Sequence, residues 1–321
     1  MKRTVIAIIA ALVAAGLDIG ACAAWPERPI MIIVPFAAGG STDNIARITA
    51  EWLTKALKQP VNVENRAGAS GAIAAEYVAN APADGYVLFM ASLAQLSIVP
   101  QMQKVRYDPF KSFAPISVAS TSMFALAVNP NFPAKTLSEF VAYLKTRPGQ
   151  VAYASAGTGS ASHLTMELFL KRAEVTMTHV PYKGVAPAIS DVMGGHVPVV
   201  FGSLSEVLRP YKSGKLRVVA VSSDKRLSQL PEVPTVAEQG YLGYQVSTWN
   251  GLVAPAATPR EVISTVINAL RPACKDAGFT ARFQAIDADA WCSTPEEFAE
   301  VLRADWLKWG EAVRSAGVTA K

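Results

Sequence analysis

Cysteine and histidine are scarce in this chain, which has three of each among its 321 residues. The histidines His163, His179 and His196 lack the spacing of metal ligands, and the paired cysteine–histidine spacing of zinc fingers is absent. The sequence therefore predicts no metal site, and we expect no cofactor.

Charge is also sparse. Asp, Glu, Lys and Arg make up 17% of the chain, and the formal net charge is +5 without any long block of like charges. This distribution gives no indication of a nucleic-acid partner, and the mild basic excess favours anionic ligands. Hydrophobic residues make up 51%, which is typical of a folded α/β protein with a large core.

An apolar segment near the N-terminus, residues 5–15, is too short to span a membrane. Lys2 and Arg3 precede it, and residues 21–23 have the small-residue pattern of a cleavage site. We therefore expect residues 1–23 to be a cleavable signal peptide and the mature chain to be exported.

Export also bears on the three cysteines. Cleavage removes Cys22, whereas residues 19–22 also fit a lipoprotein box, which would instead attach a lipid to Cys22. Cys274 and Cys292 remain, and an oxidising compartment allows them to form a disulfide. Two separate buried thiols are the alternative, and both interpretations stay open from the sequence.

Strand and helix patterns alternate along the mature chain, which indicates an α/β fold. Residues 30–34 are typical of a buried parallel strand, and the apolar spacing over residues 43–58 predicts an amphipathic helix. Strands at residues 61–64 and 86–92, with an Ala-rich helix between them, complete the β-α-β-α-β unit of a doubly wound sheet. A second α/β unit begins near Met123. Its expected strands are residues 124–128, 151–155, 177–180, 197–201 and 216–221, and a further strand is expected at residues 244–253.

Two helices are expected toward the C-terminus. Residues 259–276 form the first. Residues 294–297 have the sequence of a capping box with proline at the first helical position, so they predict the start of the second. Apolar residues recur in it at helical intervals, as in a helix that packs on a core: Phe298, Leu302, Trp306 and Trp309.

Two glycine-rich loops each follow a strand and open a helix. The first amides of a helix have no partner within it, the helix dipole is positive there, and glycine lets a ligand approach closely. The loops therefore predict paired pockets for a ligand with two carboxylates, or with one carboxylate and a polar tail. Tight turns with Ser, Thr or Asp caps are the alternative. The loops contain Phe36, Ala38, Gly39, Gly40 and Asp43 in the first, and Ser155, Thr158, Gly159, Ser160 and His163 in the second.

Enzyme signatures do not fit these loops. The second loop lacks the third glycine of a dinucleotide fingerprint, and neither loop ends like a P-loop or contains a nucleophile elbow. Ser160 and His163 are three residues apart and could share a helix face as an exported serine hydrolase would require. No third orienting group or oxyanion site accompanies them, so we expect a protein that is not an enzyme.

The first loop, residues 34–43, resembles the ligand loop of the tripartite tricarboxylate transporter receptors, or Bug family. Further stretches resemble this family in the family's order and cover the mature chain: residues 63–68, 83–86, 107–109, 153–163, 179–184, 214–217 and 230–235. The resemblance implies a type II periplasmic binding protein fold of two α/β lobes. Each lobe would hold a mostly parallel sheet flanked by helices, with hinge strands between them. Lobe 1 is expected over residues 24–122 and 246–321, and lobe 2 over residues 123–245.

The resemblance also implies a function. The chain would be a periplasmic, monomeric receptor that binds a small carboxylate between its lobes and delivers it to a two-component integral-membrane permease. A subunit that senses the ligand and signals to a membrane histidine kinase is the alternative. The residues that the resemblance assigns to the ligand site are Phe36, Ala38, Gly39, Gly40, Asp43, Ser92, Ser155, Thr158, Gly159, Ser160, His163 and Ser203.

Some of these residues have a specific expected role. Asp43 would order the first loop and its bound waters, because a bare carboxylate would repel a carboxylate ligand. The chain departs from the family at residues 201–204, where an Asp-Asn pair is common and Ser203 keeps one polar contact. It departs again at Asn250, where an aromatic residue is common. The departures predict a polar ligand, and Lys183 is expected to be a solvated surface residue.

Overall fold

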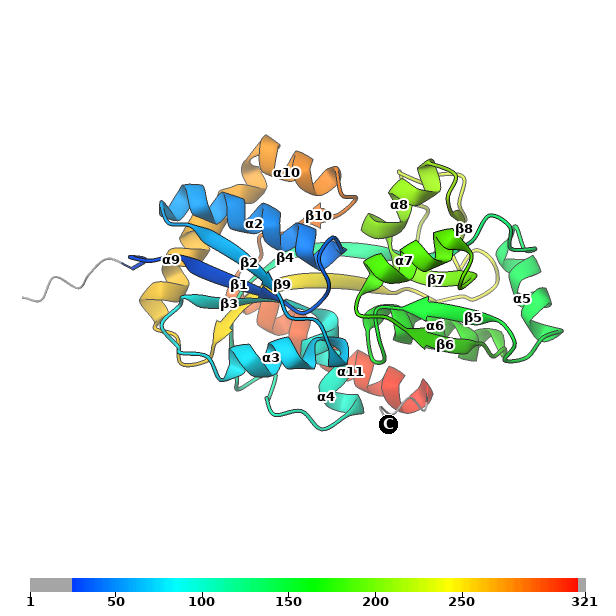
Figure 1. Cartoon of the computed structure of the whole chain (residues 1–321), viewed down its shortest axis with the longest axis horizontal. Coiled ribbons are helices and arrows are strands. Elements are labelled where there is room, and N and C mark those ends of the chain that lie inside the picture. Colours follow the sequence, from blue (N-terminus) through cyan, green and yellow to red (C-terminus); the bar gives the residue numbers. More distant parts are fainter. Residues whose placement is uncertain (1–24, 317–321) are drawn as a thin grey trace, which may run out of the picture.

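The computed structural model describes residues 25–316. The expected signal peptide and Cys22 lie outside these described residues. Within them, no helix is both long and apolar enough to cross a membrane. The chain forms two α/β lobes that lie side by side along the long axis of the molecule (Figure 1).

The lobe that contains the N-terminal part of the chain is built on three parallel strands. β1 (Ile30–Val34) lies between β2 (Val61–Asn65) and β3 (Val87–Ser92). Four of the five β1 side chains are fully buried, as expected for a central parallel strand. The longer helices of this lobe are α2 (Ser41–Leu57), α3 (Ala72–Ala79), α9 (Arg260–Leu270) and α10 (Ala277–Gln284).

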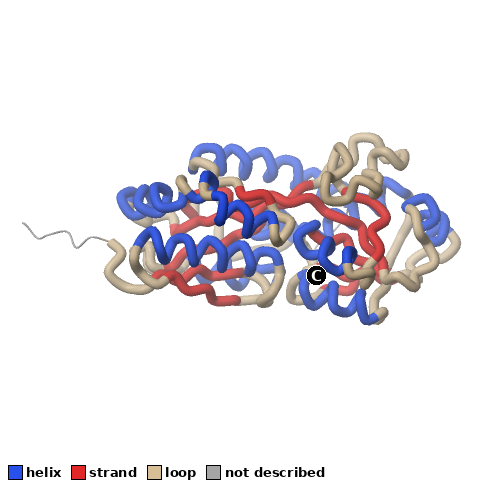
Figure 2. The backbone as a smooth tube through the Cα atoms, turned by 90° about the horizontal axis from the view of Figure 1, so that it is seen from above, coloured by secondary structure: helices blue, strands red, loops and turns tan. Residues whose placement is uncertain are grey.

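The second lobe repeats this arrangement. β5 (Ala152–Ser155) pairs in parallel with β6 (Thr178–Pro181) and with β7 (Val199–Ser203). Figure 2 shows that the strands run through the interior of both lobes and that the helices lie outside them. The helices of this lobe are α5 (Leu137–Lys145), α6 (Ala161–Ala173), α7 (Val185–Gly194) and α8 (Leu204–Lys212).

Long antiparallel strands join the lobes and make the sheet mixed. β4 (Phe113–Val128) pairs with β9 (Ser247–Pro255) as far as Met123. From Phe124 it pairs instead with β7 and with β8 (Arg217–Val221), again antiparallel. The expected parallel pairing therefore holds for the outer strands only, because the chain leaves lobe 1 along β4 and must return in the opposite direction along β9. Residues 123–245 remain the proposed extent of lobe 2.

The last helix, α11 (Pro295–Ala316), spans both lobes on one side of the sheet (Figure 1). It begins with the capping box predicted from the sequence, in which Thr294 N donates to Glu297 Oε2 at 2.8 Å. It contacts η2 (Ala94–Ile98) and α4 (Val99–Met102) of lobe 1 and also α6 of lobe 2. Trp309 is buried, whereas Trp306 is partly exposed and packs edge-on against Phe110.

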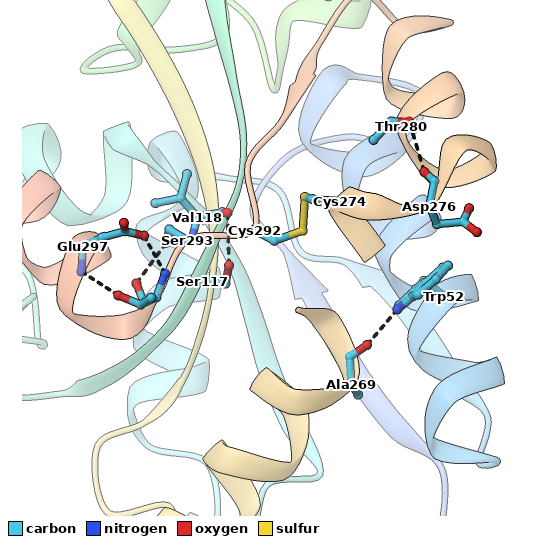
Figure 3. Close-up of a disulfide and its surroundings, with 11 residues drawn as sticks. Trp52, Ser117, Val118, Ala269, Cys274, Asp276, Thr280, Cys292, Ser293 and Glu297 are labelled. Carbon is cyan, nitrogen blue, oxygen red and sulfur yellow. Dashed lines mark hydrogen bonds between the residues drawn. A yellow bond between two sulfur atoms is a disulfide. The ribbon is translucent and has the colours of Figure 1, made fainter. Parts of the chain in front are cut away.

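Cys274 and Cys292 form a disulfide in the structure, with their Cα atoms 5.9 Å apart (Figure 3). Cys274 lies in η3 (Ala273–Lys275), just before α10. Cys292 follows β10 (Asp289–Ala290), a short strand that pairs with β4. The disulfide therefore ties the outer helices of lobe 1 to the segment that leads into α11.

Candidate functional site

A small cavity of about 60 Å³ lies where the two lobes face each other. Lobe 1 contributes the loop after β1 and the start of α2, and lobe 2 contributes the β5–α6 and β7–α8 junctions. β9 contributes Thr248 and Asn250 from the connection between the lobes. The carboxyl ends of parallel strands meet here, which is where open α/β sheets bind their ligands.

Four helix N-termini meet at this cavity. The helices α2, α6, α7 and α8 all begin at its wall, through Ser41, Ala161, Val185 and the cap Ser203. Each helix start carries a partial positive charge of about half an elementary charge. Within residues 25–316, no Lys, Arg or His lines the cavity. The site can therefore attract an anion through helix ends and hydroxyl groups without any cationic side chain.

Glu206 is the one charged side chain in the described wall of this cavity. Its Oε1 accepts a hydrogen bond from the backbone N–H of Ser41 at 2.8 Å, and its Oε2 accepts one from Ser203 Oγ at 2.7 Å. Burial raises the pKa of Glu206, and the hydrogen bonds from Ser41 and Ser203 only partly offset this. A carboxylate of lobe 2 thus caps the first helix of lobe 1.

Further hydrogen bonds cross between the lobes. Ala37 N donates to the carbonyl of Lys183 at 3.1 Å, and Ser205 Oγ donates to Ser41 Oγ at 2.9 Å. Ser70 Oγ donates to the carbonyl of Thr158. Together with the Glu206 contact, these bonds hold the lobes closed over the cavity.

Asp43 organises the first loop from beneath. Its carboxylate is buried and accepts hydrogen bonds from Gly39 N at 2.8 Å, from Arg47 Nε at 3.0 Å and from Asn65 Nδ2 at 2.9 Å. Burial alone would raise the pKa of Asp43, but these hydrogen bonds and the charge of Arg47 lower it below its usual value. This arrangement supports the loop-ordering role that we expected for Asp43.

The glycines of the first loop have different roles. Gly39 has φ +85°, a conformation that favours glycine, and it is exposed with open space around it. Gly40 is buried at the cavity wall, and a Cβ added there would lie 3.3 Å from Glu206 Oε1. Close approach of a ligand to the loop backbone at the cavity therefore depends on Gly40, whereas Gly39 provides the left-handed conformation that the turn requires.

The second loop satisfies its own amides. Ala156 N donates to Ser162 Oγ at 3.0 Å, and Gly157 N donates to Ser155 Oγ at 3.1 Å. Gly159 N donates to the Nδ1 atom of His163 at 3.0 Å. We expected free amides in this loop, but these N–H groups already have acceptors in the structure. Ser160 lines the cavity, and its hydroxyl caps α6.

The structure brings together some of the sequence-predicted site residues and separates others. The residues that line the cavity are Phe36, Gly40, Ser92, Ser160 and Ser203. Those outside its wall are Ala38, Gly39, Asp43, Ser155, Thr158, Gly159 and His163. The predicted site residues did not include Ser41, Thr42, Ser162, Glu206 and Thr248, which also line the cavity. Glu206 was missed because no local pattern connects it to Ser41, which lies 165 residues away.

A larger groove of about 760 Å³ adjoins the cavity and shares Phe36 and Ala156 with it. Its wall includes the predicted site residues Thr158 and His163, together with Lys183. Lys183 is exposed, as expected, but it stands at the rim between the lobes. The groove offers a route along which part of a ligand can extend from the cavity.

The histidines near this groove form a stack and no catalytic pair with Ser160. The rings of His163 and His179 lie 4.0 Å apart between centroids. Burial and the neighbouring His179 lower the pKa of His163 to about 3, and burial lowers the pKa of His179 to about 4. Ser160 Oγ accepts from the backbone N–H of His163 at 3.3 Å, and not from its ring. Ser155 does contact the His179 ring, at 2.6 Å, and Ser155 is fully buried.

Comparison with known proteins places this geometry in a family. Residues 45–318 match the tripartite tricarboxylate transporter family receptor. Protein BugT of Bordetella pertussis is 36% identical over 299 residues, which cover 92% of each chain. Among solved structures, Rpa4515 of R. palustris with adipate has a TM-score of 0.89 at 31% identity and covers 92% of this chain and 99% of its own. MatC of Rhodopseudomonas palustris with bound malate has a TM-score of 0.87 at 30% identity, over 90% of this chain and 100% of its own.

The family match begins within α2 and continues to residue 318, and the two solved structures cover 92% and 90% of this chain. The sequence resemblance of the loops and the similarity of the fold therefore indicate the same family. The chain belongs to the family of tripartite tricarboxylate transporter receptors.

Proposed function

We propose that this protein binds a small organic acid in the cavity between its lobes and delivers it to an integral-membrane permease. The family is one of periplasmic solute-binding receptors. The observation that carries the proposal is the convergence of the N-termini of α2, α6, α7 and α8 on one cavity without a basic side chain. This is the electrostatic design expected of a carboxylate site.

The relatives support the chemical class. Rpa4515 has adipate and MatC has malate in their structures, and both ligands are small dicarboxylic acids. We infer that the ligand of this chain is also a small carboxylate, held by the hydroxyl groups and helix starts of the cavity. Its remaining atoms extend past Phe36 and Ala156 into the adjoining groove.

Closure of the lobes would couple binding to delivery. β4 and β9 run between the lobes, so a change of backbone angles near Met123 and Ser247 can move one lobe against the other. A ligand that contacts both lobes stabilises the closed form, because only that form completes the site. A permease that recognises the closed form would then receive loaded receptors.

A thermal-shift screen over a panel of carboxylates, including adipate and malate, tests this proposal. A ligand at 100 times its dissociation constant stabilises the folded protein by about 2.7 kcal/mol, which gives a measurable rise in Tm. No stabilisation by any organic acid in the panel would contradict the proposal.

The site itself is tested by Ala161→Leu, which adds bulk at the cavity wall in the first position of α6. We expect the affinity for the best acid of the screen to fall at least tenfold, because the cavity is small. The matched control is Ala277→Leu, which changes the exposed first residue of α10, also after a side-chain cap. Equal affinity in both variants would place the site elsewhere.

A further inference from the structure

The turn that leads into α3 has a left-handed backbone over four successive residues. The φ angles are +141° at Gly68, +47° at Ala69, +52° at Ser70 and +88° at Gly71. Glycine adopts such angles readily, whereas for a residue with a Cβ they are unfavourable. Ala69 and Ser70 therefore need contacts with other parts of the chain that hold them in this conformation. We call residues 68–71 the left-handed turn.

Gln95 provides one of these contacts. Its side chain is fully buried, and its Nε2 atom donates a hydrogen bond to the carbonyl of Ser70 at 2.8 Å. A Cβ added at Gly71 would lie 2.3 Å from the same Nε2 atom, so the amide packs directly against the backbone of the left-handed turn. One buried side chain from η2 thus stabilises the turn.

Gln95 also contacts the wall of the cavity. Its Oε1 atom accepts hydrogen bonds from Ser92 N at 2.8 Å and from Ser92 Oγ at 2.9 Å, and Ser92 lines the cavity. Gln95 lies in η2, a single π-helical turn, which is a rare conformation that is frequent at functional sites. Gln95 itself lines neither the cavity nor the groove. A single buried amide therefore joins the cavity wall to the left-handed turn.

Ser70 extends this connection to the other lobe. Its hydroxyl donates to the carbonyl of Thr158 in the second glycine-rich loop. The approach is close, because a Cβ added at Gly157 would lie 3.0 Å from Ser70 Oγ. This contact joins lobe 1 to lobe 2, so it forms when the lobes close and breaks when they open. It depends on the left-handed conformation of Ser70, which is the conformation that Gln95 stabilises.

We propose that Gln95 is a positioning residue that holds Ser70 in place to bond Thr158, and that this interlobe contact slows the release of the bound acid. The inference rests on the proposed function, because it concerns the acid bound in the same cavity. Gln95 stabilises the closed form without contacting the acid. Its loss therefore weakens the binding of every acid by the same factor, whereas loss of a group that contacts the acid changes the preference among acids.

Calorimetric titration and stopped-flow fluorescence of the purified receptor test this role. The probes are malate and adipate, which differ in chain length, and the acid of the panel that stabilises the wild type most. Ser70→Ala removes the hydroxyl and keeps the Cβ. We expect the Kd of each acid to rise about two- to tenfold, as the loss of one hydrogen bond predicts, mainly through faster dissociation.

Ser213→Ala is the matched control, because Ser213 Oγ also donates to a backbone carbonyl, that of Pro210, but within lobe 2. Its Kd values should equal those of the wild type. A weaker affinity of Ser70→Ala for adipate alone would show that Ser70 contacts the longer acid in the groove, and it would overturn the inference. A lower Tm without faster dissociation would also overturn it, because Ser70 would then act only in folding.

Gln95→Met keeps the length of the side chain and removes both polar groups of its amide. We expect Kd to rise by about the factor seen for Ser70→Ala and to rise no further in the double variant, because both residues act through one contact. A further loss in the double variant would show that Gln95 acts through Ser92 at the cavity wall, against the inference. Gln239→Met is the matched control, because Gln239 donates to the carbonyl of Val219 within lobe 2.

The results for the wild type separate this inference from the proposed function. If the wild type binds an acid and the variants of Ser70 and Gln95 bind it as tightly, only the inference about the interlobe contact fails. If the wild type binds no acid of the panel, the proposed function fails and this inference fails with it.

Discussion

At the scale of single residues, the cavity shows how carboxylates of one protein take different roles. Asp43 lies beneath the first loop and accepts hydrogen bonds from Gly39, Arg47 and Asn65, which keep it ionised. Glu206 lies at the cavity wall, where burial raises its pKa. The first carboxylate holds the backbone of the loop, and the second accepts hydrogen bonds from the start of α2 and from Ser203.

Asp43→Asn is expected to lower the free energy of unfolding by about 2 kcal/mol at pH 6, because the pairing of a buried charge with Arg47 is lost. The loss depends on pH. Since the pKa of Asp43 is lower in the folded protein than its ordinary 3.8, its contribution is complete above pH 3.8 and decreases as the pH falls through the folded value.

Urea denaturation of both proteins from pH 6 to pH 3 measures this difference. The difference in the free energy of unfolding between wild type and Asp43→Asn should be constant down to about pH 4. It should decrease below that pH, because protonation is linked to folding. A gap that widens at low pH would contradict the role assigned to Asp43.

At the scale of elements, the sequence predicted most strands and helices close to where they occur. β1, α2 and β3 follow from simple periodicity, and the capping box of residues 294–297 marks the start of α11. The first half of β4 was missed, and only residues 124–128 were expected as a strand. That half contains Pro115, Ser117 and Ser120, and its register with β9 shifts twice, so its alternation is irregular.

The disulfide between Cys274 and Cys292 belongs to this scale, because it fastens α10 and the segment before α11 to each other. It closes a short loop with a sequence separation of 18, and a crosslink over a loop of this length stabilises by about 3 kcal/mol in the chain-entropy model. We expect the double variant Cys274→Ala, Cys292→Ala to lose about this much stability in urea denaturation.

Reductant provides the control for the disulfide. It should lower the stability of the wild type and leave the double variant unchanged. Thiol titration of the denatured, unreduced protein should detect neither Cys274 nor Cys292, and two reactive thiols from this pair would show that they are separate.

At the scale of the whole molecule, the structure is a closed arrangement of two lobes. The bonds that cross the cavity involve Ser41 with Glu206, Ala37 with Lys183, and Ser70 with Thr158. β4, β9 and α11 join the lobes on the other side. Opening therefore breaks a limited set of polar contacts, while the strands that connect the lobes remain paired.

Solution scattering measures this opening. We expect the free receptor to have a larger radius of gyration than the receptor saturated with its acid, because the ligand favours the closed form. An unchanged radius on saturation would contradict a mechanism based on closure.

The sequence by itself determined the α/β class, the two glycine-rich loops and the family, because periodicity, caps and motifs are local properties of the chain. It also predicted that Asp43 and Ser160 lie next to helix starts, and the structure has Asp43 in the first turn of α2 and Ser160 as the cap of α6. Only the tertiary structure decided what faces the cavity. Glu206 and Asn250 reach it from α8 and β9, far along the chain from Ser41, and the amides of the second loop turn inward to acceptors of their own. Contacts between distant segments depend on how the lobes close, and no local pattern encodes that.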